Sequence, residues 1–577
     1  MSSRGFALSL LIALAIAGLL RGLFPTADPP WNPAVGIVWH DEGAWVHNAR
    51  NKALFGAWSQ DQWNPMYIAP VFTGLEYGSF RMFGVGVRQA RLVPELFGLV
   101  SVWLLALGVA RLAGRRAGVM AAALLGTNYV YVMWNRAALM EGPMVAFIVA
   151  AWYCYTRMDE NPRWGAAASA CALLAFFTKA AAAFFVAALA LDASLALVAA
   201  STALMGSRTL DARGARWTLG GLLVGGGVAL AAFVLPNWTD YRFYNWQMSV
   251  TRKPSYDVKS VIDRLTWFPV LHDVFTRMWF VLALGTTAAL GMLARWRERS
   301  AGERLLLLWV GLGAAELILH DAGNERRFIF FIPAFVALAA IALGRARIIP
   351  EGVEHISRKH ALIALPIVLY AAYVVFGALV RLAFLREVSP NVRLAALLAV
   401  VLTAVLYLTW PRLPRALARG GWKPSSSVAL ALLVSGGQVV QYGQWVVGRS
   451  YKNYEASVEL GRRLPPGTLV HGKLANGLAL ENRIRPIFVG RGFGNYEDRK
   501  TRDDVRYILT YVAPSLGYES QAHNPIIQDV IDAYPDQRII MTFDVAETAT
   551  GHDRAALIDK FGSGAQLQSP QSGRAKH

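Results

Sequence analysis

The chain has 577 residues, of which 55% are hydrophobic and only 16% are charged, and its mean hydropathy is +0.36. Its apolar residues form runs of about 18 residues or more, which are long enough to cross a bilayer and exclude an ordinary soluble protein. The net charge of +19 would favour a nucleic-acid partner in a soluble protein, but here the basic residues gather in short loops between alternate runs. We therefore predict a polytopic α-helical membrane protein that binds no nucleic acid.

About thirteen apolar runs are predicted to be membrane spans. Arginines follow the even-numbered spans, such as Arg111, Arg115 and Arg116 after the second. The positive-inside rule then predicts a cell-membrane protein (inner or plasma membrane) with a cytoplasmic N-terminus and an extracytoplasmic region after span thirteen. The first span lacks a small-x-small cleavage pattern, so we expect it to be retained and not removed as a signal peptide. The spans are 6–24, 91–112, 117–134, 140–155, 165–177, 180–205, 217–236, 274–294, 305–319, 328–343, 361–384, 394–410 and 428–447.

The composition divides the chain after Gly448. Residues 1–448 are predicted to form the membrane domain, and residues 25–89 its long first outer loop, with an interfacial helix at 43–55 and an interfacial or re-entrant segment at 66–83. Residues 449–560 predict a small extracytoplasmic α/β domain, because TLVHG, RPIFVG, VRYILTYV and QRIIMTF have the composition of strands between helical stretches. The polar residues 561–577 predict a disordered tail.

Acidic and basic residues from several loops lie at the outer level of the predicted membrane. Asp41 and Glu42 follow span one, Arg136 and Glu141 form the turn between spans three and four, and Lys179 lies between spans five and six. Charges beside a span are costly unless they are paired or face an aqueous cavity, so they are candidates for function. Carboxylates that take a proton and cations that hold a phosphate would suit a phosphate-bearing substrate. The other candidates at this level are Glu95, Glu316, His320, Asp321, Arg326 and Arg327.

Each main candidate also has a structural explanation. These explanations are helix capping for Asp41, a helix-dipole interaction for Glu42, a helix start for Glu141, extension to the interface for Lys179, and pairing with Asp321 or Glu325 for Arg326 and Arg327. Asp192 falls in the middle of span six and has no assigned role. The histidines show no zinc-ligand spacing such as H-x-x-x-H, so the residues themselves predict no metal site.

Several segments, in their order and on their predicted side of the membrane, resemble the GT-C superfamily of glycosyltransferases that use polyprenyl-phosphate sugars. The closer likeness is to the branch that holds the protein O-mannosyltransferases and the lipid A aminoarabinose transferase, glycosyltransferase families 39 and 83. The matching segments are HDEGAW around Asp41, FGVGVRQAR before span two, RAALMEGPMVAF around Glu141, AFFTKAAAAFF around Lys179 and RRFIFFIPAFVALA from Arg326. The combination of thirteen spans with an outer α/β domain also resembles the lipid A transferase.

The resemblance implies an inverting transfer of a hexosyl or pentosyl group from polyprenyl phosphate to a lipid, glycan or protein acceptor on the extracytoplasmic face. Asp41, with Glu42 beside it, would be the catalytic carboxylate of the first loop and would deprotonate or orient the acceptor hydroxyl. Glu141 would take the second acidic position, where relatives often have Asp. No cofactor is firmly implied, although a divalent metal is compatible with the superfamily. The cations that would neutralise the leaving phosphate are Lys179, Arg136, Arg326 and Arg327.

The chain departs from the family pattern at WNPMYIAP, where Asn64 stands in place of the cation in the K-P-P-L or H-P-P-L of relatives. This difference leaves open a catalytically degenerate GT-C-like scaffold, and the mid-span Asp192 leaves open a multi-span transporter or flippase. Transporters often have paired halves and helices broken at the midplane, and this sequence shows no such symmetry. A transferase requires the carboxylate of Asp41, whereas the two alternatives do not.

Overall fold

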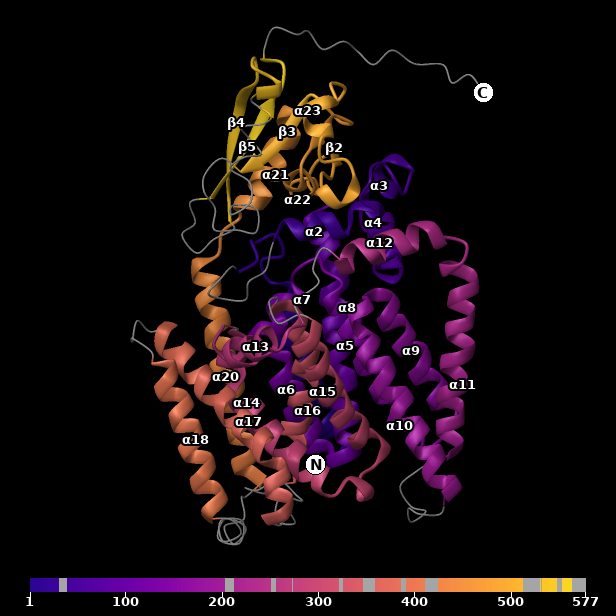
Figure 1. Cartoon of the computed structure of the whole chain (residues 1–577), viewed down its shortest axis with the longest axis vertical. Helices are drawn as coiled ribbons and strands as arrows, with labels where there is room; N and C mark the ends of the chain where they lie inside the picture. The colour runs from indigo at the N-terminus through magenta and orange to yellow at the C-terminus, as the bar shows by residue number, and fades with distance from the viewer. Residues whose placement is uncertain are drawn as a thin grey trace.

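The computed structural model describes residues 1–30, 39–202, 212–250, 256–271, 273–320, 325–345, 358–385, 391–409, 424–511, 530, 532–546 and 553–562. Within these ranges, long helices form a bundle, and a small sheet domain stands at one end of it (Figure 1). The predicted fold class, a polytopic helical membrane protein with a small C-terminal α/β domain, is confirmed.

A helix lies at each of the thirteen predicted spans. By length and composition, six helices of the described residues can cross a membrane, or seven if one bent pair is a single span, so the number thirteen stays a prediction. The helices at these positions are α1 (Ser3–Gly22), α5 (Val87–Ala113), α6 (Arg115–Gly126) with α7 (Tyr129–Asn135), α8 (Glu141–Tyr155), α9 (Trp164–Thr178), α10 (Ala183–Thr202), α11 (Ala212–Ala229), α14 (Asp273–Ala294), α15 (Ala301–His320), α16 (Phe331–Gly344), α17 (Arg358–Leu385), α18 (Val392–Thr409) and α20 (Pro424–Gly448).

The predicted third span, 117–134, is two helices, because the chain bends by 63° between α6 and α7. The Asn128 side chain accepts a hydrogen bond from Tyr131 N at 2.9 Å and so caps the start of α7. The bend ends the continuous helix and leaves the short α7 between the bundle and the outer elements (Figure 1). Short helices join other elements, namely η2 (Ala180–Ala182), η3 (Leu230–Val234, a π-helix that continues α11), η4 (Trp296–Glu298) and η5 (Glu325–Phe330).

The described part of the predicted first outer loop, residues 25–30 and 39–89, is mostly helical. The predicted interfacial helix at 43–55 is divided at Val46 into α2 (His40–Trp45) and α3 (His47–Phe55), and all six residues of α2 are buried. Figure 1 shows the reason for this burial, since the sheet domain stands directly on α2 and α3. The loop continues through the 3₁₀ helix η1 (Pro65–Tyr67) and α4 (Pro70–Phe83), and a later outer segment contains two helices that were not predicted, α12 (Trp238–Val250) and α13 (Val258–Leu271).

The sheet domain keeps the name outer domain from its predicted position. Its described residues form one five-stranded sheet in the order β2-β1-β3-β5-β4. β1 pairs in parallel with β2 and β3, whereas β5 is antiparallel to both β3 and β4. The four predicted strands are confirmed, and β5 was missed. The elements are α21 (Lys452–Arg463), β1 (Leu469–His471), α22 (Lys473–Gly477), β2 (Arg485–Ile487), η7 (Arg491–Phe493), α23 (Asp498–Thr501), β3 (Tyr507–Tyr511), β4 (Arg538–Val545) and β5 (Asp553–Asp559). Of the predicted tail, residues 563–577 lie outside the described residues.

Candidate functional site

Asp41 lies on the short helix α2 and points to a cation from a distant part of the chain. Its Oδ2 accepts a hydrogen bond from Arg326 Nη1 at 2.7 Å. Arg326 belongs to η5, directly before α16, and both side chains are nearly buried, with relative exposures of 7% for each residue. The ion pair therefore joins the loop after α1 to the start of α16, the helix at predicted span ten.

Glu141 continues this arrangement from the first turn of α8, where a carboxylate is favoured by the helix dipole. Its Oε1 accepts a hydrogen bond from Lys179 Nζ and lies 3.4 Å from Arg326 Nε. The other oxygen, Oε2, is buried and has no hydrogen-bond partner among the described residues. Four charged side chains thus alternate in sign in one row, in the order Asp41, Arg326, Glu141 and Lys179; the first three are buried and Lys179 is partly exposed. We call these four residues the charged row.

Lys179 lies in the turn between α9 and η2, where its extended backbone (φ −158°, ψ 124°) ends the preceding helix. Burial lowers the pKa of Lys179 to about 8, which Glu141 opposes and the cations Arg326 and Arg327 reinforce. Buried ion pairs carry a large desolvation cost and add little stability compared with apolar packing. Their clustering at one end of a helical bundle therefore marks this row as a candidate site for an anionic substrate.

Glu42, although adjacent to Asp41, has a different set of partners. Its Oε1 accepts from Arg91 Nε at 2.8 Å and from Ala138 N at 2.7 Å, and its Oε2 accepts from Arg91 Nη2 at 2.7 Å. Arg91 also donates through Nη1 to the carbonyl oxygens of Pro25 and Ala27, at 2.9 and 2.6 Å. Glu42 therefore ties α2 to α5 and to the turn before α8, and both its oxygens are engaged in that role.

Arg136 and Arg327 do not lie in the charged row. The guanidinium of Arg136 donates to the carbonyl oxygens of Leu20, Arg21 and Phe24 at the end of α1, and its Cζ lies 4.6 Å from the ring centroid of Trp445. Arginines often bind the last carbonyl groups of a helix in this way. Arg327 Nη1 lies 3.7 Å from Glu316 Oε1 of α15. Of the remaining candidates, Asp321 and the side chain of His320 lie outside the described residues.

Asp192, which had no assigned role, is fully buried and paired. It accepts hydrogen bonds from Arg304 Nε at 2.8 Å and from Tyr155 Oη at 2.8 Å. The three side chains join α10, α15 and α8, so this mid-span charge is neutralised by a neighbouring helix. In the part of the chain that the structure describes, no group of three or more His, Cys, Asp or Glu side chains is arranged to hold a metal ion.

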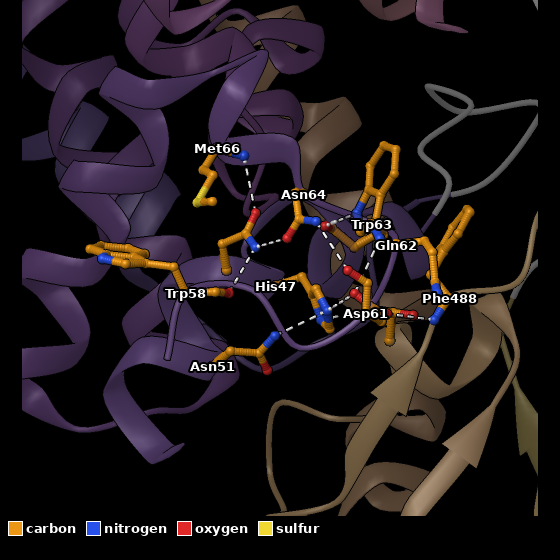
Figure 2. A network of polar contacts seen from close by, with 12 residues as sticks. His47, Asn51, Trp58, Asp61, Gln62, Trp63, Asn64, Met66 and Phe488 are labelled. Atoms are coloured by element: carbon orange, nitrogen blue, oxygen red, sulfur yellow. Dashed lines mark hydrogen bonds and ion pairs between the residues drawn. The ribbon is translucent and has the colours of Figure 1, made fainter. Parts of the chain in front are cut away.

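A second polar network, which the sequence did not predict, holds the loop after α3 (Figure 2). Asp61 Oδ1 lies 2.9 Å from His47 Nε2, and its Oδ2 accepts from Phe488 N of the outer domain at 2.8 Å. Asn64, the residue at the position of the family's cation, donates to Tyr244 Oη and accepts from Asn48, both at 2.9 Å. Tyr244 and Phe488 lie 180 and 427 positions from their partners in the loop, so no motif or spacing pointed to the network.

Comparison with known proteins gives a consistent result. Residues 68–203 match the family described as dolichyl-phosphate-mannose-protein mannosyltransferase. The structure is similar to ArnT from Cupriavidus metallidurans bound to undecaprenyl phosphate, with a TM-score of 0.57 and 16% identity over 98% of this chain and 100% of ArnT. For ArnT in the apo state the TM-score is 0.55, with 16% identity over 96% and 98% of the two chains. No curated protein matches in sequence. The resemblance to the GT-C superfamily, in the branch of the mannosyltransferases and ArnT, is confirmed.

Proposed function

We propose that this GT-C-type protein transfers a sugar from a polyprenyl phosphate to an acceptor hydroxyl on the outer face of the membrane, with inversion at the anomeric carbon. The observation that carries the proposal is the charged row, in which carboxylates and cations from four separate elements meet in a buried position. The similarity to an ArnT structure that binds undecaprenyl phosphate supports a polyprenyl phosphate as the lipid of the donor. In this orientation the N-terminus is cytoplasmic and the outer domain extracytoplasmic.

Asp41 takes the role of the general base. Its carboxylate oxygen Oδ2 accepts a hydrogen bond from Arg326 in the structure. The phosphate of the donor competes for the donors of Arg326 and frees the Asp41 carboxylate for the acceptor hydroxyl. Binding of the donor and activation of the base are thereby coupled through one guanidinium group.

The transfer itself is a single displacement. The acceptor oxygen forms a bond to the anomeric carbon, the bond from that carbon to the phosphate oxygen breaks, and the hydroxyl proton passes to Asp41. Lys179 and Arg326 stabilise the charge that develops on the leaving polyprenyl phosphate, which is an effective form of catalysis in a site that excludes water. Glu141 contacts both cations and so keeps them next to each other.

The alternatives receive less support. Transport was suggested by Asp192, and its pairing with Arg304 and Tyr155 gives this residue a structural role. A degenerate scaffold was suggested by Asn64, which is buried in the network of the first outer loop and supports the loop that carries Asp41. Neither residue therefore argues against a functional charged row.

The proposal is tested in cells that lack the chain and are complemented with variants. Mass spectrometry of surface lipids, glycans and glycoproteins should show a sugar modification that disappears without the chain and returns with the natural protein. Asp41→Asn should insert normally and bind undecaprenyl phosphate, yet fail to restore the modification, because general-base catalysis contributes about 10²–10⁴-fold. Lys179→Ala should lose both binding and transfer. Full restoration by Asp41→Asn would rule out the assigned role of this carboxylate.

A further inference from the structure

The helix that carries Asp41 is in direct backbone contact with the outer domain. A methyl group added to Gly43 of α2 would overlap the carbonyl oxygen of Asn476 in α22. One added to Gly477 would lie 2.8 Å from His40 Cβ and 2.9 Å from His40 Cα, closer than side chains normally approach. The two backbones meet at this point because both helices have a glycine there.

This contact lies on the side of α2 opposite to the charged row. Residues 41 and 43 are separated by about 200° around a helix of 3.6 residues per turn. Gly43 and His40 face α22, and Tyr511 Oη, at the end of β3, lies 3.5 Å from His40 Nδ1. The Asp41 carboxylate meets Arg326 through Oδ2, and its Oδ1 lies 4.0 Å from His40 Nε2. The helix α2 is thus held between the outer domain and the membrane bundle, with the catalytic carboxylate on its inner side.

Buried polar groups of α3, the helix that follows α2, anchor the contact. Arg50 of α3, which is 1% exposed, donates to the carbonyl oxygens of Ala479, Asn482 and Ile484 at 3.0, 3.0 and 2.9 Å. His47 Nδ1 lies 3.0 Å from Asn476 Nδ2. These bonds all go to one segment of the outer domain, residues 473–484, which we call the docking segment.

The other end of the first outer loop is held at the sheet itself. Trp63 Nε1 donates to Ala44 O of α2 at 2.6 Å, and its ring stacks on Phe488 with centroids 4.9 Å apart. Phe488 directly follows β2, and its backbone nitrogen donates to Asp61, as Figure 2 shows. Glu481 of the docking segment also accepts from Val87 N at the start of α5, at 2.7 Å. The first outer loop and the outer domain therefore form one packed unit.

The contact with the first outer loop lies at the carboxyl ends of the three parallel strands, β1, β2 and β3. In open α/β sheets, ligands bind outside the carboxyl ends of the parallel strands. Here the carboxyl ends of β1, β2 and β3 lead into α22, Phe488 and Tyr511, and all three contact the first outer loop. The protein itself thus occupies the edge at which a substrate would bind, which favours a structural task for this part of the domain.

We propose that the docking segment is a positioning element that sets the place of Asp41 relative to Arg326, and that sugar transfer requires the outer domain to be docked. The proposal rests on the function proposed above and adds Asn476 and Gly477 to the residues on which the reaction depends. Neither residue touches the substrate. They act through α2, by holding the backbone that carries the carboxylate.

Gly477→Ala tests the proposal in the full-length protein. The new methyl group would lie 2.5 Å from Trp39 Cζ3 and 2.9 Å from His40 Cα, so it pushes against the start of α2. A shift of the order of 1 Å at a reacting group lowers a rate by roughly 100-fold. We expect the initial rate at which the modification appears in complemented cells to fall by about this factor. The affinity for undecaprenyl phosphate should not fall, because Lys179 and Glu141 lie on other elements and a displaced Asp41 competes less for Arg326. The matched control is Gly78→Ala on α4, where nothing lies within 4 Å of the new methyl group, and it should leave both quantities unchanged.

Asn476→Ala is the second variant, and it decides the question if Gly477→Ala does not accumulate. It removes the bond to His47 without adding volume, so amide hydrogen exchange in residues 40–45 should become faster and the transfer rate should fall. An unchanged transfer rate in either variant, or a loss of undecaprenyl phosphate binding together with transfer, would overturn the positioning role. Full activity of Asp41→Asn would instead refute the proposed function, so the two failures are distinguishable.

Discussion

Glu141→Gln should make the protein bind a polyprenyl phosphate more tightly while it makes the ligand-free protein less stable. In the structure Glu141 lies between Lys179 and Arg326 and neutralises both. A phosphate held by these cations lies roughly 6 Å from Glu141, the length of two successive ion-pair contacts. At an effective dielectric constant of about 20, two negative charges at that distance repel each other by about 3 kcal/mol. Removal of the carboxylate charge should therefore lower the Kd by about 100-fold.

The same substitution leaves two buried cations without their shared partner, and breaking a buried pair costs about 3–5 kcal/mol. The apparent melting temperature of the purified protein should fall and should recover when undecaprenyl phosphate is added. Titration of intrinsic tryptophan fluorescence with this lipid measures the Kd. Glu316→Gln is the control, because Glu316 pairs only with Arg327 at 3.7 Å among the described contacts and is partly exposed. A Kd for Glu141→Gln that is equal to or weaker than that of the natural protein would refute the phosphate site.

Three further outcomes are expected. Arg136→Ala should lower the melting temperature, because this side chain binds carbonyl groups at the end of α1. The affinity of the folded protein for undecaprenyl phosphate should stay unchanged, and weaker binding would show that Arg136 contacts the phosphate. Asp192→Asn should destabilise the bundle by about 3–5 kcal/mol, since Arg304 loses its buried partner, and thermal unfolding in detergent measures the loss. Burial lowers the pKa of His471 to about 3, below about 6.5 in the unfolded chain, so stability of the outer domain is complete above pH 6.5 and falls as the pH decreases from there. His471→Leu should reduce this slope in pH-dependent unfolding between about pH 6.5 and 5, and an unchanged slope would contradict the assignment.

The sequence predicted the helices well because long apolar runs have few alternatives to a helix in a membrane. It missed the bend between α6 and α7, since the run 117–134 is apolar apart from Thr127 and Asn128, and only the capping by Asn128 marks the break. It also missed β5, whose sequence DRAALID has weak strand propensity and forms a strand because it is buried between β3 and β4. The bend and the strand β5 are both decided by tertiary contacts, which the periodicity of the sequence does not reveal.

For the candidate site, the sequence predicted the level of each charged residue along the membrane normal. It did not predict the direction in which each side chain points from its helix. Asp41, Glu141, Lys179 and Arg326 were predicted and meet in the charged row. Glu42 was predicted on the same grounds, but one residue along α2 turns a side chain by about 100°, and it faces Arg91. The contact of His47 with Asn476 spans 429 positions of the chain, and no local pattern encodes it.

The contact between Gly43 and Asn476 also has a consequence for the order of events during biosynthesis. Ribosomes make the chain from the N-terminus, and the segment that supports α2 is completed only after the last bundle helix, α20. Until that segment has left the ribosome and folded, the inserted helices lack the support that aligns Asp41. Under the proposed mechanism an incomplete chain is inactive, so transfer begins only once synthesis is finished. Incomplete chains therefore do not consume the lipid-linked sugar.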